Sequence, residues 1–326
     1  MPPLLAGTLK WCLGFSRRAL IQTSMCSLQH RRGRRCSRQL VLKGHTAAAR
    51  RLIHAGAAVN YEDPTDECPA LVAAVRGGYG AVVTDLLLAG ASPPSNWRDE
   101  NGLHLPHLSA ESGYTEVVSA LLNTNTDISI DDCHGYETPL MFASSAGHLL
   151  TVKTLLAAGA DISLRGGGDG HAALDCAAWN GHTEEMKAII GHSVGVDARC
   201  PCGYTALHNT AGTMHSDAME VLIDVGADIN AQNERGETPL HESADYSDSK
   251  ATRILLQRGV IVHVVDRDGN TALLRACRLQ WKGLETAVDL LLRWGASEAT
   301  VNKALRHLPL QLLDVYLDGL RKTNEK

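Results

Sequence analysis

Residues 138–148 read TPLMFASSAGH, and the same pattern returns as AALDCAAWNGH at 172–182, TALHNTAGTMH at 205–215 and TPLHESADYSD at 238–248. These stretches align without gaps with three more segments, which begin at Pro69, His104 and Thr271. The starts therefore lie at positions 69, 104, 138, 172, 205, 238 and 271, which is a nearly constant interval. A fixed period of this length is typical of a solenoid of stacked repeats, which replaces the alternative of two globular domains.

A second landmark keeps the same register. An aliphatic residue ends a helical pattern at a constant offset from each start, at Leu86, Leu121, Leu155, Ile189, Leu222 and Leu255. Counting back from Leu52 by the same offset adds a degenerate first repeat. In the last repeat, Leu291 follows Thr271 by more residues than this offset, which indicates three extra residues near 281–284. The chain therefore contains about eight repeats, which start near residues 35, 69, 104, 138, 172, 205, 238 and 271.

The residue pattern of each repeat predicts two helices followed by a loop. Thr138 and Thr238 precede prolines, which is the arrangement of an N-cap hydroxyl and a proline at the first helical position. A glycine then ends the first helix, at Gly44, Gly78, Gly113, Gly147 and Gly181. Another glycine follows the second helix, where the chain adopts a left-handed turn, at Gly56, Gly90, Gly159, Gly226, Gly259 and Gly295.

The sequence resembles the ankyrin repeat family in TPLH at 238–241, TALH at 205–208, the Gly-His pairs at 147 and 181 and LLAAGAD at 155–161. The resemblance covers residues 35–297. It implies an all-α repeat protein, an ankyrin-type solenoid of stacked helix-turn-helix units with hairpin-like loops. It also implies that His208 and His241 are structural and bond neighbouring loops. Residues 1–34 then form a basic leader, and 298–326 a C-terminal capping helix and tail.

Charge and composition exclude several classes of protein. The net charge is -5, but residues 1–40 hold eight Lys or Arg and no acid, so 23 bases face 36 acids afterwards, a net -13. Such an acidic body repels phosphate, and we expect no nucleic-acid partner. The apolar stretches are shorter than the ~20 residues that cross a bilayer, so we expect no membrane span. Nine scattered cysteines favour a reducing compartment.

The leader leaves the localisation open. Residues 1–34 are basic, free of acids and contain serines, which resembles an organellar transit peptide. The alternatives are a nuclear import run, RRGRR at 31–35, and an unstructured start. We expect a cytoplasmic or nuclear protein, with organellar import as the alternative.

Four short motifs resemble chemical sites but lack the context that the chemistry needs. GHSVG at 191–195 follows a helix, whereas a nucleophile elbow needs a strand before its serine. HESAD at 241–245 has Asp245 where a zinc helix needs its second His. Gly166–Gly168 with Gly170 precede no Gly-Lys-Ser or Gly-Lys-Thr, so a hairpin tip is favoured over a phosphate loop.

The fourth motif is CPC at 200–202, which supplies two of the four ligands of a closed zinc site. Metal or redox chemistry at this pair remains an alternative. We expect no catalytic residue, no metal and no cofactor.

We expect the chain to bind another protein. The resemblance implies that the loop tips and the concave face of the inner helices form the binding surface. Aromatic residues with acidic neighbours suit a partner segment that is basic and apolar. The alternative for the tips is a solvated acidic edge, and for Trp179 packing on the next repeat. The candidate partner-binding residues are Tyr61, Trp97, Asp99, Glu100, Tyr136, Trp179, Tyr204 and Tyr246. We expect a monomer that acts as a scaffold or adaptor.

Two other functions stay open. LPL at 308–310 with YL at 316–317 is faintly similar to the end of a SOCS box, which links ankyrin proteins to ubiquitin ligases, although the upstream Leu-and-Cys helix is missing. The chain would then be a substrate receptor of a ubiquitin ligase. An enzyme of unrecognised type is the other alternative. Asn60 and Asn230 occupy a position that is sometimes hydroxylated in the family.

Overall fold

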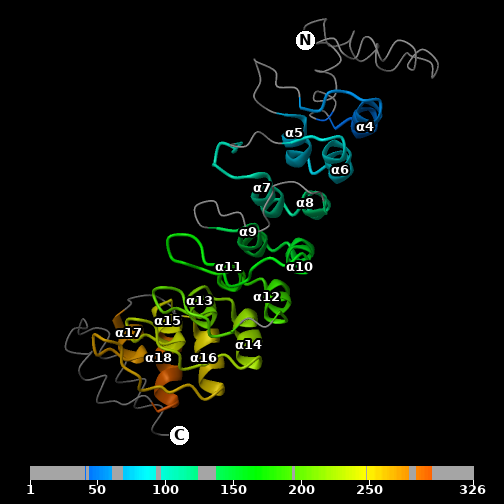
Figure 1. Ribbon diagram of the computed structural model, residues 1–326. Coiled ribbons are helices and arrows are strands. Elements are labelled where there is room, and N and C mark those ends of the chain that lie inside the picture. The colour runs from blue at the N-terminus through cyan, green and yellow to red at the C-terminus, as the bar shows by residue number, and fades with distance from the viewer. Residues whose placement is uncertain are drawn as a thin grey trace, which may run out of the picture. The chain divides into compact units, whose positions relative to one another are not determined.

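The computed structural model describes residues 41, 44–60, 69–92, 97–123, 137–192, 195–246, 248–278 and 284–295. Contacts divide the chain into two bodies, residues 1–132 and 133–326, which we call the N-terminal and the C-terminal body. Over the described residues, both bodies are built from helices and contain no strand (Figure 1). The all-α repeat fold expected from the sequence is confirmed.

The N-terminal body has two layers of helices. Its first helices, α5 and α7, pack on each other, while α6 packs between α4 and α8 in the second layer. The bounds are α4 (Thr46–His54), α5 (Ala70–Arg76), α6 (Gly80–Leu88), α7 (Leu105–Glu111) and α8 (Thr115–Asn123).

The C-terminal body repeats this arrangement. Each first helix packs on the first helix of the next repeat, in the order α9, α11, α13, α15 and α17, and the second helices follow in parallel from α10 to α18. The first helices are α9 (Pro139–Ala146), α11 (Ala173–Trp179), α13 (Ala206–Gly212), α15 (Pro239–Asp245) and α17 (Ala272–Arg278). The second helices are α10 (Leu149–Ala157), α12 (Thr183–Ile190), α14 (Ser216–Asp224), α16 (Ser249–Gln257) and α18 (Leu284–Arg293).

The helix ends follow the sequence signals. The Thr138 side chain accepts a hydrogen bond from the Met141 backbone N–H at 3.4 Å, as an N-cap does. All eleven glycines that the sequence analysis placed at helix ends have positive φ angles, between 69° and 94°. At Gly147, a Cβ would also lie 2.6 Å from the His182 ring, so both the backbone angle and the space require glycine.

Met214 departs from this rule. It stands at the position that Gly147 and Gly181 occupy in earlier repeats, and it keeps their left-handed backbone, with a φ of 63°. A side chain in this conformation is strained, because Cβ approaches the following carbonyl oxygen. The repeat fold thus imposes the turn even where the sequence does not supply glycine.

The core is aliphatic, as the low aromatic content predicts. The largest fully buried side chains among the described residues are Leu, Ile and Met. They include the second landmark of every complete repeat from Leu86 to Leu255. A core of small side chains allows helix pairs to stack closely and leaves aromatic residues for other positions.

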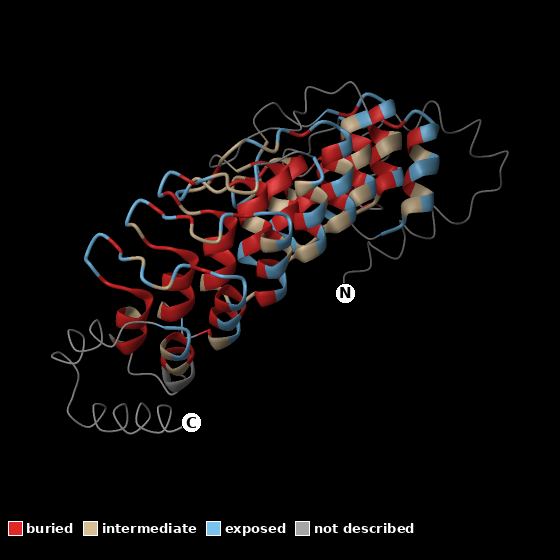
Figure 2. Cartoon of the chain, turned by 90° about the horizontal axis from the view of Figure 1, so that it is seen from below, coloured by how far each residue is buried: buried red, intermediate tan, exposed pale blue. Residues whose placement is uncertain are grey.

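The two helices of a repeat differ in burial (Figure 2). In α13, six of seven residues are buried, whereas α14 buries four of nine, spaced so that one side faces the core. The first helices therefore have little exposed surface. Any side chain that remains exposed on them is a candidate for contact with a partner.

Candidate partner-binding site

Two aromatic residues at the ends of first helices in the C-terminal body are exposed. Trp179 ends α11 and Tyr246 directly follows α15, and each keeps 52% of its surface accessible. The Trp179 ring has a contact with His171 of the preceding loop, at 6.4 Å between ring centroids. Large apolar side chains that stay exposed beside a well-packed core commonly mark interaction surfaces.

A cluster of carboxylates lies close to Tyr246. The guanidinium of Arg275 on α17 forms ion pairs with Glu237, Asp245 and Asp266, the last at 2.7 Å. Because a guanidinium offers five donors in one plane, a single arginine can bond several carboxylates at once. These carboxylates come from the loops before α15 and α17 and from the end of α15, so the cluster ties neighbouring repeats together.

Tyr204 connects this cluster to a fourth carboxylate. Its hydroxyl donates to Glu242 Oε1 at 3.0 Å and to Glu237 Oε2 at 3.2 Å. Burial raises the pKa of Glu242 to about 7, although the hydrogen bond from Tyr204 acts to lower it. Burial also raises the pKa of Asp245. Burial opposes the ionisation of Glu237 too, but bonds from Asn233 and Arg275 outweigh it and lower its pKa.

Charge in this region is unbalanced. Glu237, Glu242, Asp245 and Asp266 are four acids, and Arg275 is the one basic side chain that is ion-paired with them among the described residues. We call this region the aromatic–acidic face. Its aromatic residues Trp179 and Tyr246 are exposed, whereas the acids Glu237, Glu242 and Asp266 are buried. The region consists of Trp179, Tyr204, Glu237, Glu242, Asp245, Tyr246, Asp266 and Arg275.

The structure separates the predicted binding residues. Trp179, Tyr204 and Tyr246 lie in the C-terminal body, whereas Trp97, Asp99 and Glu100 lie in the N-terminal body. Tyr61 and Tyr136 lie outside the described residues.

In the N-terminal body, Trp97 is half-buried against the core, and the Arg76 guanidinium lies 5.8 Å from its ring centre. Asp99 accepts bonds from the backbone N–H groups of Asn101 and Leu103, so it shapes its own turn, while Glu100 is exposed. These contacts give Trp97 and Asp99 structural roles, whatever else they contact.

The structural role expected for two histidines is confirmed. His208 Nε2 donates to the Glu237 carbonyl and His241 Nε2 to the Asn270 carbonyl, both at 3.1 Å and both into the next repeat. Each Nδ1 accepts from the backbone N–H of a threonine, Thr205 or Thr238. Burial lowers the pKa of His208 to about 4, which keeps the ring neutral and this bonding pattern fixed.

The motifs that resembled chemical sites have structural explanations where they are described. Gly166 and His171 pair across the expected hairpin-like loop, with a bond of 2.8 Å. Cys200 is buried and burial raises its pKa, so its thiol is not readily a metal-binding thiolate. Within the described part of the chain, no group of three metal-ligating side chains gathers. Ser193 lies outside it.

The candidate residues selected from the sequence did not include Asn209, Glu242 and Arg275, which lie at the middle of first helices. These three residues occupy one equivalent position in three successive repeats. Polar residues at a helix position that is otherwise buried were the signal that could have found them.

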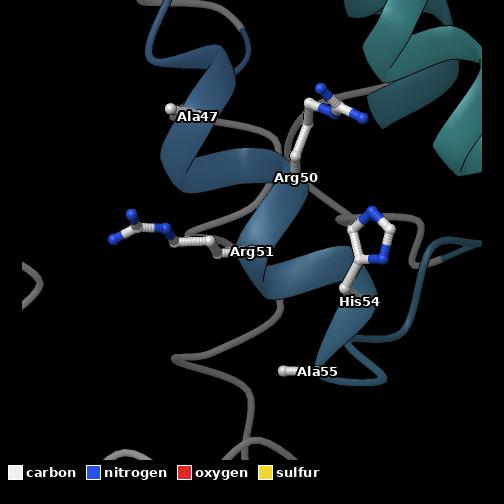
Figure 3. Close-up of a pocket in the computed structure, with 5 residues that line it drawn as sticks. All are labelled: Ala47, Arg50, Arg51, His54 and Ala55. Atoms are coloured by element: carbon white, nitrogen blue, oxygen red, sulfur yellow. The ribbon is translucent and has the colours of Figure 1, made fainter. Parts of the chain in front are cut away.

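A basic hollow lies on α4 in the N-terminal body (Figure 3). It is lined by Ala47, Arg50, Arg51, His54 and Ala55. Arg50 and His54 both reach Asp85 of α6, at 2.5 and 3.2 Å, and they lower the pKa of Asp85 although its burial acts in the opposite direction. These two side chains therefore join α4 to α6.

Comparison with known proteins agrees with the geometry. The family model described as ankyrin repeats (3 copies) matches residues 71–166, 140–233, 174–264 and 214–303. The chain belongs to the ankyrin repeat family. Ankyrin repeats are in general modules for protein–protein interaction.

Three curated relatives share part of the repeat region. The chain is 34% identical over 151 residues to the ankyrin repeat protein nuc-2 of Neurospora crassa. It is 30% identical over 156 residues to the ankyrin repeat and KH domain-containing protein mask-1, and 31% over 147 residues to a homolog of transient receptor potential cation channel subfamily A member 1, both of Caenorhabditis elegans. These matches cover 46%, 47% and 43% of this chain but 14%, 6% and 11% of the relatives.

A solved structure shows the same fold. The ankyrin repeat domain of human ASB11 superposes with a TM-score of 0.61 at 22% identity, over 72% of this chain and 99% of that one. None of the described helices is long and apolar enough to cross a membrane. The expected C-terminal capping helix and tail at 298–326, which includes the SOCS-like motif of the alternative function, and the leader at 1–34 lie outside the described residues.

Proposed function

We propose that this chain is a non-enzymatic adaptor that binds a protein partner through the aromatic–acidic face of its C-terminal body. The observation that carries the proposal is the 52% exposure of both Trp179 and Tyr246 at the ends of first helices whose other residues are mostly buried. Rings of this size contribute most of the binding energy at protein interfaces when a partner covers them. The adjacent carboxylates favour a partner with basic residues.

The test compares two exposed tryptophans of the same body. Trp179 lies on the aromatic–acidic face, and Trp294 follows α18 with a similar exposed fraction of 49%. Proteins retained by the wild-type chain would be identified by affinity purification and mass spectrometry, and the affinity of each purified partner then measured for Trp179→Ala and Trp294→Ala. We expect at least a tenfold loss of affinity for Trp179→Ala and less than a twofold change for Trp294→Ala. Equal affinities of both variants would refute the proposal.

The aromatic pair gives a second measurement. Tyr246→Ala is expected to weaken binding of the same partner, because the tyrosine lies beside the acidic residues that attract the partner. Loss of partner binding in Trp97→Ala alone, with Trp179→Ala unchanged, would instead place the interface in the N-terminal body.

A further inference from the structure

Two cysteines share one tight turn in the loop that precedes α13. The Gly203 N–H donates to the Cys200 carbonyl at 2.8 Å, which closes a turn with Pro201 and Cys202 at its centre. In such a turn, Cα atoms two residues apart are separated by about 5.5 Å, and a disulfide spans about 4.4–6.8 Å. The backbone therefore places the two side chains within reach of a covalent bond.

The two thiols are in contact but differ in exposure. The Cys200 thiol forms a hydrogen bond with the Cys202 thiol. Cys200 keeps only 5% of its surface accessible, whereas Cys202 is exposed. Burial raises the pKa of the Cys200 thiol, so this side chain stays protonated at neutral pH. An oxidant from solvent therefore reaches Cys202 first, and Cys200 lies beside the product.

Other repeats have an oxygen acceptor where this turn has a sulfur. The equivalent positions hold Asp99, Asn233 and Asp266. Asn233 Oδ1 accepts a hydrogen bond from the Glu237 N–H at 2.9 Å, and in the same way the Cys200 sulfur accepts from the Tyr204 N–H. A thiol is a weaker acceptor than an amide or a carboxylate. The turn itself therefore does not explain a cysteine at position 200.

We propose that Cys200 and Cys202 form a redox site, which a hydroperoxide converts reversibly into a disulfide within the chain. The Cys202 sulfur attacks one peroxide oxygen and becomes a sulfenic acid, while the O–O bond breaks and the other oxygen leaves as an alcohol with the Cys202 proton. The Cys200 sulfur then attacks the sulfenic sulfur, and the sulfenic hydroxyl leaves as water with the Cys200 proton. The two thiols lose two electrons, which reduce the peroxide. A dithiol reductant returns both thiols by exchange.

The disulfide changes the hydrogen bonds of the turn. Once the Cys200 sulfur is bonded to Cys202, it no longer accepts from the Tyr204 N–H as it does in the reduced chain. Tyr204 belongs to the aromatic–acidic face, where its hydroxyl donates to Glu237 and Glu242. Oxidation therefore alters the backbone that carries a residue of this face. The reaction itself needs no partner protein, so it can be tested separately from the proposed function.

The test uses the full chain, because one tryptic peptide isolates the pair. Trypsin cleaves after Arg199 and Arg235, and residues 200–235 contain no other cysteine and no internal lysine or arginine. The folded chain is treated with hydrogen peroxide, unfolded, alkylated with iodoacetamide and digested for mass spectrometry. We expect this peptide to have lost two hydrogen atoms and to carry no alkyl group. After dithiothreitol, both thiols should be alkylated.

Three variants assign the roles of the thiols. Cys200→Ser leaves the sulfenic acid of Cys202 without a resolving thiol, and we expect at least fivefold more adduct with dimedone, which traps sulfenic acids, than in the wild type. Cys202→Ser leaves only the buried thiol, which should be oxidised at least tenfold less. Cys176→Ser removes a partly buried thiol of α11 and should leave the yield of disulfide within twofold. Circular dichroism verifies the fold of each variant.

Hydrogen exchange shows whether the pair reacts in the folded turn. The Tyr204 N–H should exchange at least threefold faster in the oxidised chain, because it loses the Cys200 sulfur as acceptor. The Glu237 N–H occupies the equivalent place one repeat later, where it donates to Asn233 Oδ1, and its exchange should be unchanged.

Three results would overturn the proposal. The first is a peptide 200–235 that remains fully alkylated after peroxide. The second is a dimedone adduct as abundant in the wild type as in Cys200→Ser. The third is faster exchange of Glu237 together with Tyr204, which would mean that the pair reacts only after the repeats unfold.

Discussion

Helices α5 and α15 occupy equivalent positions in their repeats, but the buried residues of α5 are apolar and several of those of α15 are polar. Each buries six of its seven residues. In α5 the buried residues are Ala, Leu and Val, so Val72 and Ala73 occupy the positions that His241 and Glu242 occupy in α15. The buried residues of α5 are held by apolar packing, whereas those of α15 also form hydrogen bonds to adjacent repeats.

This difference shows where the chain departs from what folding requires. Apolar packing suffices to form the repeat, as α5 demonstrates, and a buried carboxylate such as Glu242 costs free energy relative to the alanine of α5. Polar groups at such a position are therefore more informative about function than the aliphatic residues that recur in every repeat.

Among the substitutions that test this comparison, removal of the Arg275 side chain should change the free energy of unfolding most. Arg275→Met leaves Glu237, Asp245 and Asp266 without their cation, and unpaired buried charges typically cost several kcal/mol. Since the arginine is partly exposed, we expect a loss of about 3 kcal/mol in the free energy of unfolding of the C-terminal body. Urea unfolding with fluorescence detection measures it.

The matched control is Arg267→Met, in an exposed turn, which should change stability by less than about 0.5 kcal/mol. If both variants were equally stable, the polar network would contribute nothing and the contrast with α5 would disappear.

An intermediate effect is expected for Glu242→Gln, with a defined pH dependence. Because burial raises the pKa of Glu242 to about 7 in the folded chain, stability is lost as the pH rises from its ordinary pKa of about 4.5 through 7. Glutamine cannot ionise and avoids this loss. The variant should match the wild type at pH 4.5 and exceed it by about 2 kcal/mol at pH 8.

Urea unfolding at both pH values decides this prediction. His208, whose pKa is lowered to about 4, makes the folded state less stable as the pH falls from about 6.5, but it does so in both proteins and cancels in their difference. A constant difference across the pH range would show that Glu242 does not titrate as its burial requires.

The smallest effect is expected at Met214, where the sequence departs from glycine. Met214→Gly removes a side chain from a left-handed backbone, and the relief of about 1 kcal/mol is partly offset by the greater freedom of glycine in the unfolded chain. We expect a net gain of about 0.5 kcal/mol, seen as a rise in the thermal midpoint. Gly181→Met should do the opposite and more strongly, since a Cβ there would lie 2.4 Å from His215 Nδ1.

The sequence was sufficient for the fold and insufficient for the site. The period located the helices and the glycine turns, and the family resemblance implied the bonds of His208 and His241, because each of these features depends on residues within one repeat and its neighbour. Arg275 could not be assigned in this way, since its partners lie in loops and helices of two repeats and only side-chain geometry joins them.

The exposure of individual side chains also could not be predicted from the spacing of residues in the sequence. Of the candidate residues, Trp179 and Tyr246 are exposed, whereas Trp97 is half-buried against the core and Tyr204 has its hydroxyl bonded to two carboxylates.

The histidine bonds described above also bear on how the chain acquires its structure. His208 and Glu237 are 29 residues apart, as are His241 and Asn270, and Asn230 bonds Ile261 at a separation of 31. Interactions of this kind link each repeat to the next and to no distant part of the chain. Folding can therefore start at any adjacent pair of stable repeats in the C-terminal body and spread outward, without the delay of closing a long loop.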